Sequence, residues 1–384
     1  MRIDKHKDDC CGCTLCSVVC PQGAITMKAD TMGFLYPEVN DSLCIDCGLC
    51  VKKCAFTPQY TTENNHQQPI AYGGRHKDLK EVAKSQSGAA FVVLSDYILS
   101  QGGVVYGAGY KEHFRVAHKR AENAEERDEF RGSKYVQSDM TGIFTDIKVD
   151  LDDGKIVMFS GTPCQTAAVS SYFNNFKHRS NLFLMDIICH GVSGPFVWRD
   201  YLQYLEKKQG ERLTAVNFRD KRYKGWHSYV ESFTFEHSNT YTYTYMFYSF
   251  ISFRYSCGKC PYTNLRRPSD ITVGDFWGVE QSKAAPLGED NKGCSLFIIN
   301  TGKGNSWFEH TKHELEYVKV DLNEIMQPQL RHPVMLNKKR DQYEKDYSKL
   351  GFEFVRRKYG NVGLNLIINK IKNVLRPIIT CIRK

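Results

Sequence analysis

Two cysteine runs near the amino terminus decide the fold of that part of the chain. Residues 10–21 read CCGCTLCSVVCP, and residues 44–54 read CIDCGLCVKKC. Three thiolates spaced by two residues wrap around one 4Fe-4S cube, and a fourth thiolate three residues further on ligates another cube. The spacing therefore predicts one cluster on Cys10, Cys13, Cys16 and Cys54, and a second cluster on Cys44, Cys47, Cys50 and Cys20.

Zinc on paired CxxC motifs is the alternative for these eight cysteines. Two four-thiolate zinc sites would require neither the exchanged fourth cysteine nor the proline at position 21. Two positions depart from the bacterial ferredoxin pattern: Ala55 stands where that pattern has proline, and Cys11 is an extra thiol that we expect to be a bystander. Residues 1–60 are thus expected to form a small bacterial-ferredoxin-like domain that transfers electrons.

The overall composition is that of an ordinary globular protein, with 384 residues, 41% hydrophobic and 25% charged. The first residues, MRIDKHKDD, contain no apolar core of a signal peptide, and no apolar stretch is long enough to span a membrane. Fifteen cysteines without an export signal favour reduced thiols and metal binding over disulfides. We therefore expect a cytoplasmic protein.

The net charge of +9 is concentrated at the end of the chain. Residues 337–384 hold thirteen Lys/Arg and four Asp/Glu, so the remaining residues sum to zero. This distribution argues against nucleic acid as a partner, because nucleic-acid-binding proteins usually spread basic side chains over a folded face.

Apolar residues in the same tail recur at the spacing of one helical face. They are Leu364, Ile367, Ile368, Ile371, Val374, Leu375 and Ile378. A basic amphipathic helix can lie on an anionic membrane surface, so we expect the tail to dock there, peripherally, or on an acidic partner. A terminal helix packed on the protein's own core is the alternative.

The rest of the chain divides into a linker, a large domain and a tail. Residues 61–72 are polar and predict the linker, residues 73–330 predict a mixed α/β domain, and residues 331–384 predict a basic helical tail. The expected fold class is therefore α+β and α/β. Helices are expected over 89–99 and from about residue 166, and strands over 104–108, 156–160, 182–188 and 270–274. Alternating aromatics predict further strands at Phe233 and Phe235 and at Tyr241, Tyr243 and Tyr245.

Four later cysteines can form another site. Cys164 and Cys189 each follow a predicted strand and precede a helix, and open α/β sheets build their sites at such strand ends. Cys257 and Cys260 add a CxxC pair, and four soft ligands at one place would fit a third 4Fe-4S cluster. Zinc, a redox-active cysteine pair and buried small side chains are the alternatives. Two cysteines without such a setting are expected to be structural: Cys294 and Cys381.

Seven strings of this chain occur in the same order in a known family. They are SQSGAA (85–90), RGSKYVQSD (131–139), GTPCQ (161–165), ICHGVSG (188–194), FRDK followed by GW (218–226), CGKC (257–260) and DITVGDFWG (270–278). With the cysteine runs, they resemble the beta subunit family of coenzyme F420-reducing hydrogenases and dehydrogenases over about residues 1–300. The resemblance implies an iron–sulfur flavoprotein that binds FAD, and it favours the third cluster on the four later cysteines. It does not fix the substrate.

A binding place for the implied FAD has to differ from a Rossmann site, because no GxGxxG motif opens a βαβ unit. Ser85, Gln86, Ser87 and Gly88 precede a predicted helix, where free N–H groups and hydroxyls can hold a pyrophosphate. N-capping by Ser85 or Ser87 is the alternative. A compact basic string can complete the anion site, unless it is a solvated turn; its candidate residues are Ser133, Lys134 and Tyr135.

A loop rich in cations and aromatics, residues 218–227, can cover an anionic planar substrate or the flavin ring by charge and stacking. A surface strand end with scattered charges is the alternative. His190 stands beside a candidate cluster cysteine and can tune or protonate the site, unless it is structural. The catalytic candidates are therefore His190, Lys221 and Trp226.

Together these observations predict an FAD-dependent iron–sulfur oxidoreductase. Clusters move one electron at a time, whereas most organic reductions need two, and a flavin supplies that conversion. The expected partners are ferredoxin or another redox carrier, a deazaflavin included, and an organic substrate. A non-catalytic electron-transfer subunit that connects a partner enzyme to ferredoxin, and a thiol-based redox regulator at CGKC, are the alternatives.

Overall fold

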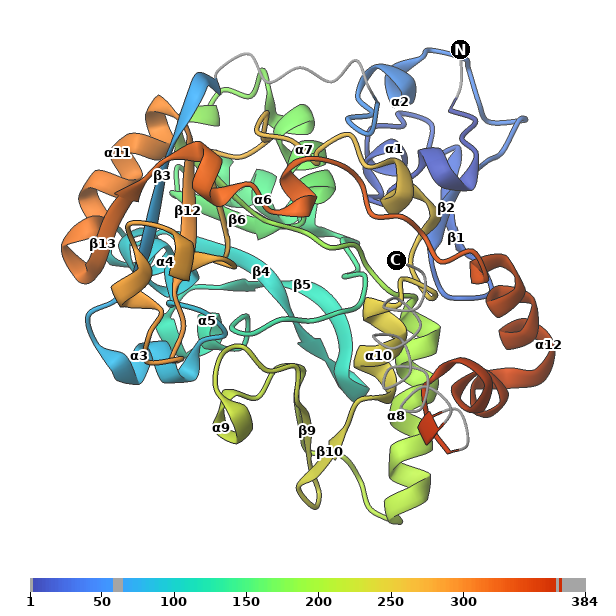
Figure 1. Ribbon diagram of the computed structural model, residues 1–384. Coiled ribbons are helices and arrows are strands. Elements are labelled where there is room, and N and C mark those ends of the chain that lie inside the picture. Colours follow the sequence, from blue (N-terminus) through green and yellow to red (C-terminus); the bar gives the residue numbers. More distant parts are fainter. Residues whose placement is uncertain (1–2, 58–64, 364–365, 368–384) are drawn as a thin grey trace, which may run out of the picture.

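The amino-terminal module is small and built around its cysteines. The computed structural model describes residues 3–57, 65–363 and 366–367. Each cysteine run leads into one helical turn, α1 (Leu15–Val18) and α2 (Leu49–Lys52). Between the runs, β1 (Ile25–Ala29) pairs antiparallel with β2 (Leu35–Val39). Figure 1 shows this module in blue, on the same side of the molecule as the carboxy-terminal helix α12 (Arg340–Tyr359).

A mixed eight-stranded sheet forms the centre of the molecule, in the order β13-β3-β12-β11-β7-β6-β4-β5. Its four inner strands β11, β7, β6 and β4 run parallel, and the strands outside them pair antiparallel. The bounds are β3 (Asn65–His76), β4 (Val104–Lys111), β5 (Arg115–Ala121), β6 (Val157–Gly161), β7 (Leu182–Ile187), β11 (Ile271–Asp275), β12 (Ser295–Thr301) and β13 (Leu315–Val320). The strands expected over 104–108, 156–160, 182–188 and 270–274 are β4, β6, β7 and β11.

Helices cover both faces of this sheet, which explains why its central strands are apolar on both sides. One face packs against α4 (Ala90–Ser100) and α11 (Gly302–Thr311), and it includes Val105, Met158 and Met185. The opposite face packs against α6 (Ile143–Asp152) and α7 (Pro163–Phe173), through the alternate strand residues Val104, Val157 and Leu182. The parallel strands therefore end at one shared edge between the helical layers (Figure 1).

A second layer lies beside the sheet. It contains the long helix α8 (Pro195–Gln209), a three-stranded sheet of β8 (Ala215–Asn217), β9 (Glu231–Thr234) and β10 (Ser238–Thr240), and the short helices α9 (Lys221–Lys224) and α10 (Thr242–Tyr248). The strand expected at Phe233 is β9. The strand expected over Tyr241, Tyr243 and Tyr245 is wrong, because these residues belong to α10 or its amino-terminal boundary.

The three tyrosine side chains differ in burial, and this difference explains why the segment is helical. A strand would bury all three on one face, but Tyr243 is 1% exposed while Tyr241 and Tyr245 are 48% and 38% exposed. Tyr243, Met246 and Phe247 are the buried apolar positions of this segment, and their i, i+3, i+4 spacing is that of a helix. Alternating Tyr and Thr residues have high strand propensity, and packing overrides it here.

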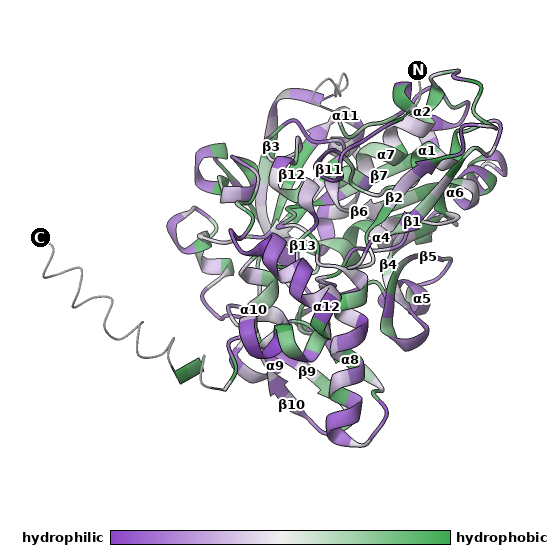
Figure 2. Cartoon of the chain, turned by 90° about the vertical axis from the view of Figure 1, so that its right-hand side faces the viewer, coloured by the Kyte–Doolittle hydropathy of each residue, from purple (hydrophilic) through white to green (hydrophobic). Residues whose placement is uncertain are grey.

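The basic tail contains the helix α12, so this part of the carboxy-terminal region is helical as expected. Tyr343, Tyr347, Phe352 and Val355 pack into the same core as α8, and Gly351 breaks the helical path with φ 76°. The outer side of α12 is hydrophilic (Figure 2). The apolar stripe expected from residue 364 to residue 378 lies almost wholly outside the described residues. Among the helices that the structure describes, none is long and apolar enough to cross a bilayer.

Candidate functional site

The eight cysteines of the amino-terminal module surround two small cavities. Cys44, Cys47, Cys50 and Cys20 line one cavity of about 20 Å³. Cys10, Cys13, Cys16 and Cys54 line the other, also about 20 Å³, together with Cys11. Each cavity thus takes three cysteines from one run and the fourth from the other run, which is the exchange expected from the spacing. Four thiols around a cavity suit a four-thiolate cube.

One cysteine sulfur of this module accepts a backbone hydrogen bond. The Ala24 N–H lies 3.3 Å from the Cys20 sulfur and donates to it, and hydrogen bonds to cluster sulfurs tune the reduction potential. Within residues 3–57, 65–363 and 366–367, no three His, Cys, Asp or Glu side chains meet at a single point suited to one metal ion. The cysteines of the amino-terminal module instead surround the two cavities.

The four later cysteines come together at the shared edge of the parallel strands. Cys164 follows β6 and Cys189 follows β7, and these adjacent strands are parallel, so their carboxyl ends lie side by side. Cys257 and Cys260 approach from the turn at Tyr255–Lys259. Burial raises the pKa of Cys257 to about 12, and the neighbouring Cys164 and Cys260 thiols add to the rise.

The string GTPCQ has a clear local role in this arrangement. Thr162 and Gln165 form a capping box at the start of α7, with Pro163 as its first residue. The helix therefore begins at Pro163, three residues earlier than expected, and Cys164 sits in its first turn. The Gly191 N–H lies 3.3 Å from the Cys189 sulfur, which gives that cysteine a hydrogen-bond donor as well.

Cys11 is not remote from these sites. It is 4% exposed, and hydrogen bonding to Cys13 and burial raise the pKa of its thiol, while a hydrogen bond with Cys164 opposes that rise. Cys11 therefore lies between a cysteine of the amino-terminal module and a cysteine of the strand-end group. The spacing of the first run could not reveal this, because it depends on how the module docks.

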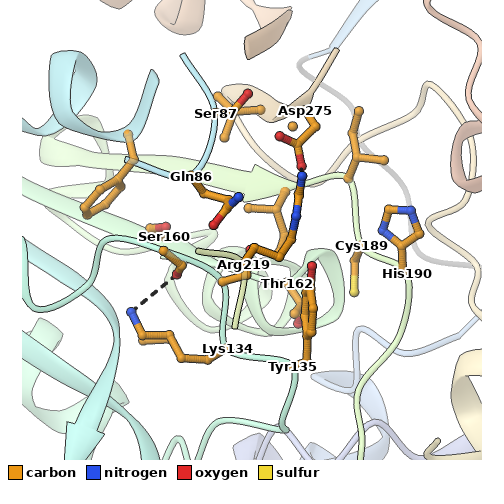
Figure 3. Close-up of a pocket in the computed structure, with 18 of the residues that line it drawn as sticks. Gln86, Ser87, Lys134, Tyr135, Ser160, Thr162, Cys189, His190, Arg219 and Asp275 are labelled. Atoms are coloured by element: carbon orange, nitrogen blue, oxygen red, sulfur yellow. Dashed lines mark hydrogen bonds and ion pairs between the residues drawn. The ribbon is translucent and has the colours of Figure 1, made fainter. Parts of the chain in front are cut away.

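A large cavity of about 280 Å³ opens beside the strand-end cysteines. All but one of the residues expected to bind the cofactor line it: Ser85, Gln86, Ser87, Ser133, Lys134 and Tyr135. Figure 3 shows Gln86 and Lys134 at one side of this cavity and Cys189 and His190 at the other. The candidate anion site and Cys189, one member of the cysteine group, therefore face the same space.

Three buried polar atoms on the cavity wall lack a partner among the described residues. They are Ser85 Oγ, Gln86 Nε2 and Arg131 Nη1. Buried donors without acceptors are costly, and native proteins rarely leave several together unless something binds them. The other two nitrogens of the Arg131 guanidinium are occupied, since they pair with Asp128 and Glu81. Three free donors in one wall fit an anionic group such as a pyrophosphate.

Two other expected anion ligands are engaged with the protein itself. Ser87 Oγ donates to the Cys294 carbonyl at 2.7 Å. The Lys134 ammonium donates to the carbonyls of Glu129 and Arg131 at 3.1 and 2.8 Å, and burial lowers the pKa of Lys134 to about 7. These two side chains hold the shape of the cavity wall.

Gly88 does not line the cavity, but its backbone is tightly enclosed. A Cβ there would lie 2.5 Å from the Gly74 carbonyl oxygen and 2.7 Å from the Ser295 nitrogen. The Gly88 N–H donates to Ser295 Oγ, so it is not available to a ligand. Gly88 therefore lets the Ser85–Ser87 segment lie close to β3 and β12 just before α4 begins.

The other end of the cavity combines an arginine with aromatic rings. Arg219 Nη1 lies 2.5 Å from Asp275 Oδ2, and the guanidinium stacks within 5.3 Å of the Tyr229 and Trp277 ring centres. His190 lines this end, and burial lowers the pKa of its imidazole, so the ring is neutral near pH 7. The arrangement suits a flat, anionic molecule or ring.

The other two catalytic candidates lie outside the cavity lining. Lys221 donates to the carbonyls of Val82 and Lys292 at 2.7 Å each, which ties α9 to the segment before Ser85. Trp226 is fully buried, and its indole N–H donates to Asp275 at 2.6 Å. Both side chains support residues of the wall. They do not face the space themselves.

His118 is a cavity residue that the sequence did not single out. It lies on β5, its Nδ1 is 2.7 Å from Ser138 Oγ, and its Nε2 is 3.0 Å from the Ser160 carbonyl. Burial lowers the pKa of His118 to about 4, so the ring is neutral and stacks on Phe159. A lone histidine in a strand carries no spacing signal that could have identified it.

Comparison with known proteins agrees with these features. Residues 154–324 match the C-terminal region of the beta subunit of coenzyme F420 hydrogenase/dehydrogenase, and residues 9–57 match a 4Fe-4S dicluster domain. No curated protein matches the chain. One solved structure with a similar chain is the F420-reducing [NiFe] hydrogenase complex from Methanosarcina barkeri, at 15% identity and a TM-score of 0.46, covering 77% of this chain and 91% of that chain. On these matches, the chain carries a domain of the coenzyme F420 hydrogenase/dehydrogenase beta subunit family over residues 154–324, together with an amino-terminal 4Fe-4S domain.

Proposed function

We propose that this chain is an FAD-dependent iron–sulfur oxidoreductase that passes electrons between a ferredoxin-type or deazaflavin carrier and an organic substrate. Two clusters would be held by the amino-terminal module and a third by Cys164, Cys189, Cys257 and Cys260. A bound flavin would supply the conversion between one-electron and two-electron transfer. The protein would supply binding and orientation.

One observation carries the proposal. A cavity of about 280 Å³ has on one wall three buried donors that no described residue accepts from, and Cys189 on another. A nucleotide cofactor anchored by its phosphates at the donors would extend toward the cysteine group. Neither feature alone would favour a flavin over another anion or over an isolated metal centre.

The residues at the donor end would divide the work of binding. Ser85, Gln86 and Arg131 would donate to phosphate oxygens, Arg131 through the one guanidinium nitrogen that Asp128 and Glu81 do not occupy. Ser87 and Lys134 would keep the wall in place through their carbonyl acceptors. Tyr135 stacks on Phe247 with ring centres 4.2 Å apart and would form part of an apolar surface for a flat ring.

The substrate would enter at the end lined by Arg219, Tyr229, Trp277 and His190. The Asp275 carboxylate fixes the Arg219 guanidinium over the two aromatic rings, so a flat anionic group would meet a positive and aromatic surface. The neutral His190 imidazole would be able to accept a proton beside the substrate. The proposal concerns a class of molecule, a flat anionic electron acceptor or donor.

Anaerobic purification with quantitation of iron, sulfide and flavin tests the proposal directly. We expect about twelve irons per chain, as three cubes require, and about one FAD. Reduction of the flavin band by a low-potential carrier and its reoxidation by an organic acceptor would support catalysis. A chain that carries the clusters and transfers electrons but binds no flavin would instead favour a non-catalytic electron-transfer subunit.

The carboxy-terminal tail remains a separate part of the proposal. Its excess of Lys and Arg would hold the chain on an anionic membrane face or an acidic partner. Sedimentation with anionic vesicles would compare the full chain with one ending at Tyr359. Equal and negligible pelleting of both at low salt would exclude the membrane.

A further inference from the structure

Arg254 differs from the other fully buried arginines in its counter-charge. Five arginine side chains are at most 3% exposed: Arg127, Arg219, Arg254, Arg267 and Arg340. Four of these pair with a carboxylate at 2.5 to 3.1 Å. Arg254 is 1% exposed, and no carboxylate of the described residues lies within ion-pair distance of it. A buried charge without a partner is costly, so a counter-charge is expected at this position.

The contacts of Arg254 point to where that counter-charge belongs. Its Nε donates to the Cys10 carbonyl at 2.7 Å, and its Nη2 lies 3.7 Å from the Cys10 sulfur. Its Nη1 donates to Gln137 Oε1 at 2.9 Å, and Nη2 also donates to the Leu35 carbonyl at 2.8 Å. The guanidinium lies 4.2 Å from the Tyr36 ring centre. Every acceptor apart from the Cys10 sulfur is neutral.

The amino-terminal module is shaped to receive this side chain. A Cβ at Gly12, which has φ +69°, would lie 2.7 Å from Arg254 Nη1. Gln137, which accepts from Arg254, also donates through its Nε2 to the Cys11 carbonyl at 2.7 Å. The first cysteine run is therefore held from two sides by Arg254 and Gln137, which belong to the large domain.

The same arginine is connected to the strand-end cysteines. Its backbone N–H donates to Val192, in the loop that carries Cys189, and its carbonyl accepts from the Cys257 N–H at 3.1 Å. Arg254 therefore lies between Cys10 on one side and Cys257 and the loop that carries Cys189 on the other.

We propose that the anionic cluster held by Cys10, Cys13, Cys16 and Cys54 is the missing counter-charge of Arg254, and that Arg254 raises the midpoint potential of that cluster. The inference rests on the proposed function, since it requires this cluster. A four-thiolate cube gains one negative charge for each electron that it accepts, without a bond forming or breaking. A fixed cation beside Cys10 stabilises the reduced form more than the oxidised form, and a hydrogen bond to the sulfur acts in the same direction. Arg254 is thus a positioning residue for electron transfer.

Potentiometric titration monitored by electron paramagnetic resonance tests this on the full-length, anaerobically purified chain. Arg254→Gln removes the charge, and Arg254→Lys keeps it. In Arg254→Gln we expect one cluster signal to move to lower potential by a tenfold or larger change in the reduced-to-oxidised ratio, which is 59 mV for one electron. In Arg254→Lys we expect a smaller shift, with the other signals unchanged in both variants.

The matched control is the double variant Arg127→Gln/Asp96→Asn. Arg127, in the large domain, is 2% exposed and has its own carboxylate, Asp96, at 2.6 Å, so the double change removes a buried arginine without changing the net charge. We expect the cluster potentials of this control to equal those of the wild type. A shift in the control as large as that in Arg254→Gln would mean that packing, not charge, determines the potential.

The remaining outcomes also decide the matter. Unchanged potentials in an Arg254→Gln protein with full iron content would overturn the inference and leave the proposed function intact. A wild-type chain without iron would overturn both. If Arg254→Gln and Arg254→Met lose iron while Arg254→Lys retains it, the charge is required for the cluster. If all three lose iron equally, the role of Arg254 is only structural and the inference fails.

Discussion

At the scale of single residues, the free donors in the cavity wall make the sharpest prediction. Gln86→Leu should weaken FAD binding about 10- to 150-fold, because a hydrogen bond to a charged group contributes roughly 1.5–3 kcal/mol. Ser87→Ala is the matched control next to it, since Ser87 Oγ donates to the Cys294 carbonyl and not into the cavity. Flavin titration of the iron-loaded protein measures both. Equal losses in the two variants would show that the segment as a whole, and not the Gln86 donor, matters.

A second residue-scale prediction concerns a buried carboxyl outside the cavity. Burial raises the pKa of Glu231 to about 8, although Thr244 and Tyr201 donate hydrogen bonds to it. The folded protein therefore keeps a proton on Glu231 that the unfolded chain loses above its ordinary pKa of about 4.3. Stability should fall as pH rises from about 4.5 to 8, by at most about 1.4 kcal/mol per pH unit from this group.

Glu231→Gln tests this because the amide stays neutral at every pH. Thermal unfolding of the variant and the wild type should diverge between pH 5 and pH 8, with the wild type losing more stability as pH rises. A constant difference between the two proteins across this range would mean that Glu231 is ionised in the fold.

What the sequence revealed at this scale depended on spacing. The two cysteine runs and the CxxC pair have fixed intervals, and the structure gathers the cysteines of each expected set. Ser87 and Lys134 were chosen by residue type alone, and their polar atoms are used by neighbouring carbonyls. Which polar atom stays free is decided by packing between segments distant in sequence. Packing between distant segments also brings His118 to the cavity and Arg254 to Cys10, so neither position could be predicted from local spacing.

At the scale of elements, the four inner strands of the large sheet followed from their apolar runs, because strands buried on both faces are continuously apolar. The stretch from Tyr241 to Tyr245 failed because strand propensity and helical burial compete over only a few residues. The antiparallel strands β3, β12 and β13 were not predicted individually. Their pairing joins residues 65–76 with residues 295–320, and no local signal encodes such long-range contacts.

The positions of the four later cysteines on these elements also predict which substitutions should abolish the proposed third cluster. Cys164 and Cys189 stand at the ends of adjacent parallel strands, and Cys257 and Cys260 approach from one turn. Cys257→Ser/Cys260→Ser should therefore lower the iron content by about four per chain, the content of one cube. Cys294→Ser is the control, since Cys294 is buried but lies just before β12, with its sulfur 3.8 Å from the Gly74 carbonyl. Equal iron content in wild type and double variant would exclude the four cysteines as a cluster site.

At the scale of the whole molecule, the cysteine groups form a connected series. The amino-terminal module docks on the large domain through Arg254 at Cys10, Lys7 at Glu344 and Lys53 at the Ser171 carbonyl. Cys11 lies between the module and Cys164, and Cys189 lines the large cavity. The docking interface therefore places the set of Cys10, Cys13, Cys16 and Cys54 next to the strand-end cysteines. The set of Cys20, Cys44, Cys47 and Cys50 lies further from them. Cys47 is exposed, so the set of Cys20, Cys44, Cys47 and Cys50 reaches solvent.

The exchanged ligands of the module give the last prediction, which iron counts on the full chain can decide. Cys54 lines the cavity of the first run, and Cys20 lines the cavity of the second run. Cys13→Ser and Cys54→Ser should each cost about four irons, and the double variant should cost the same four, because both cysteines serve one cube. Cys13→Ser/Cys20→Ser should cost about eight, since two cubes then lack a ligand. If the exchange is absent, the pattern reverses: Cys13→Ser/Cys20→Ser would cost four irons and Cys13→Ser/Cys54→Ser would cost eight. The two double variants differ only in which fourth cysteine is removed, so each serves as the control for the other.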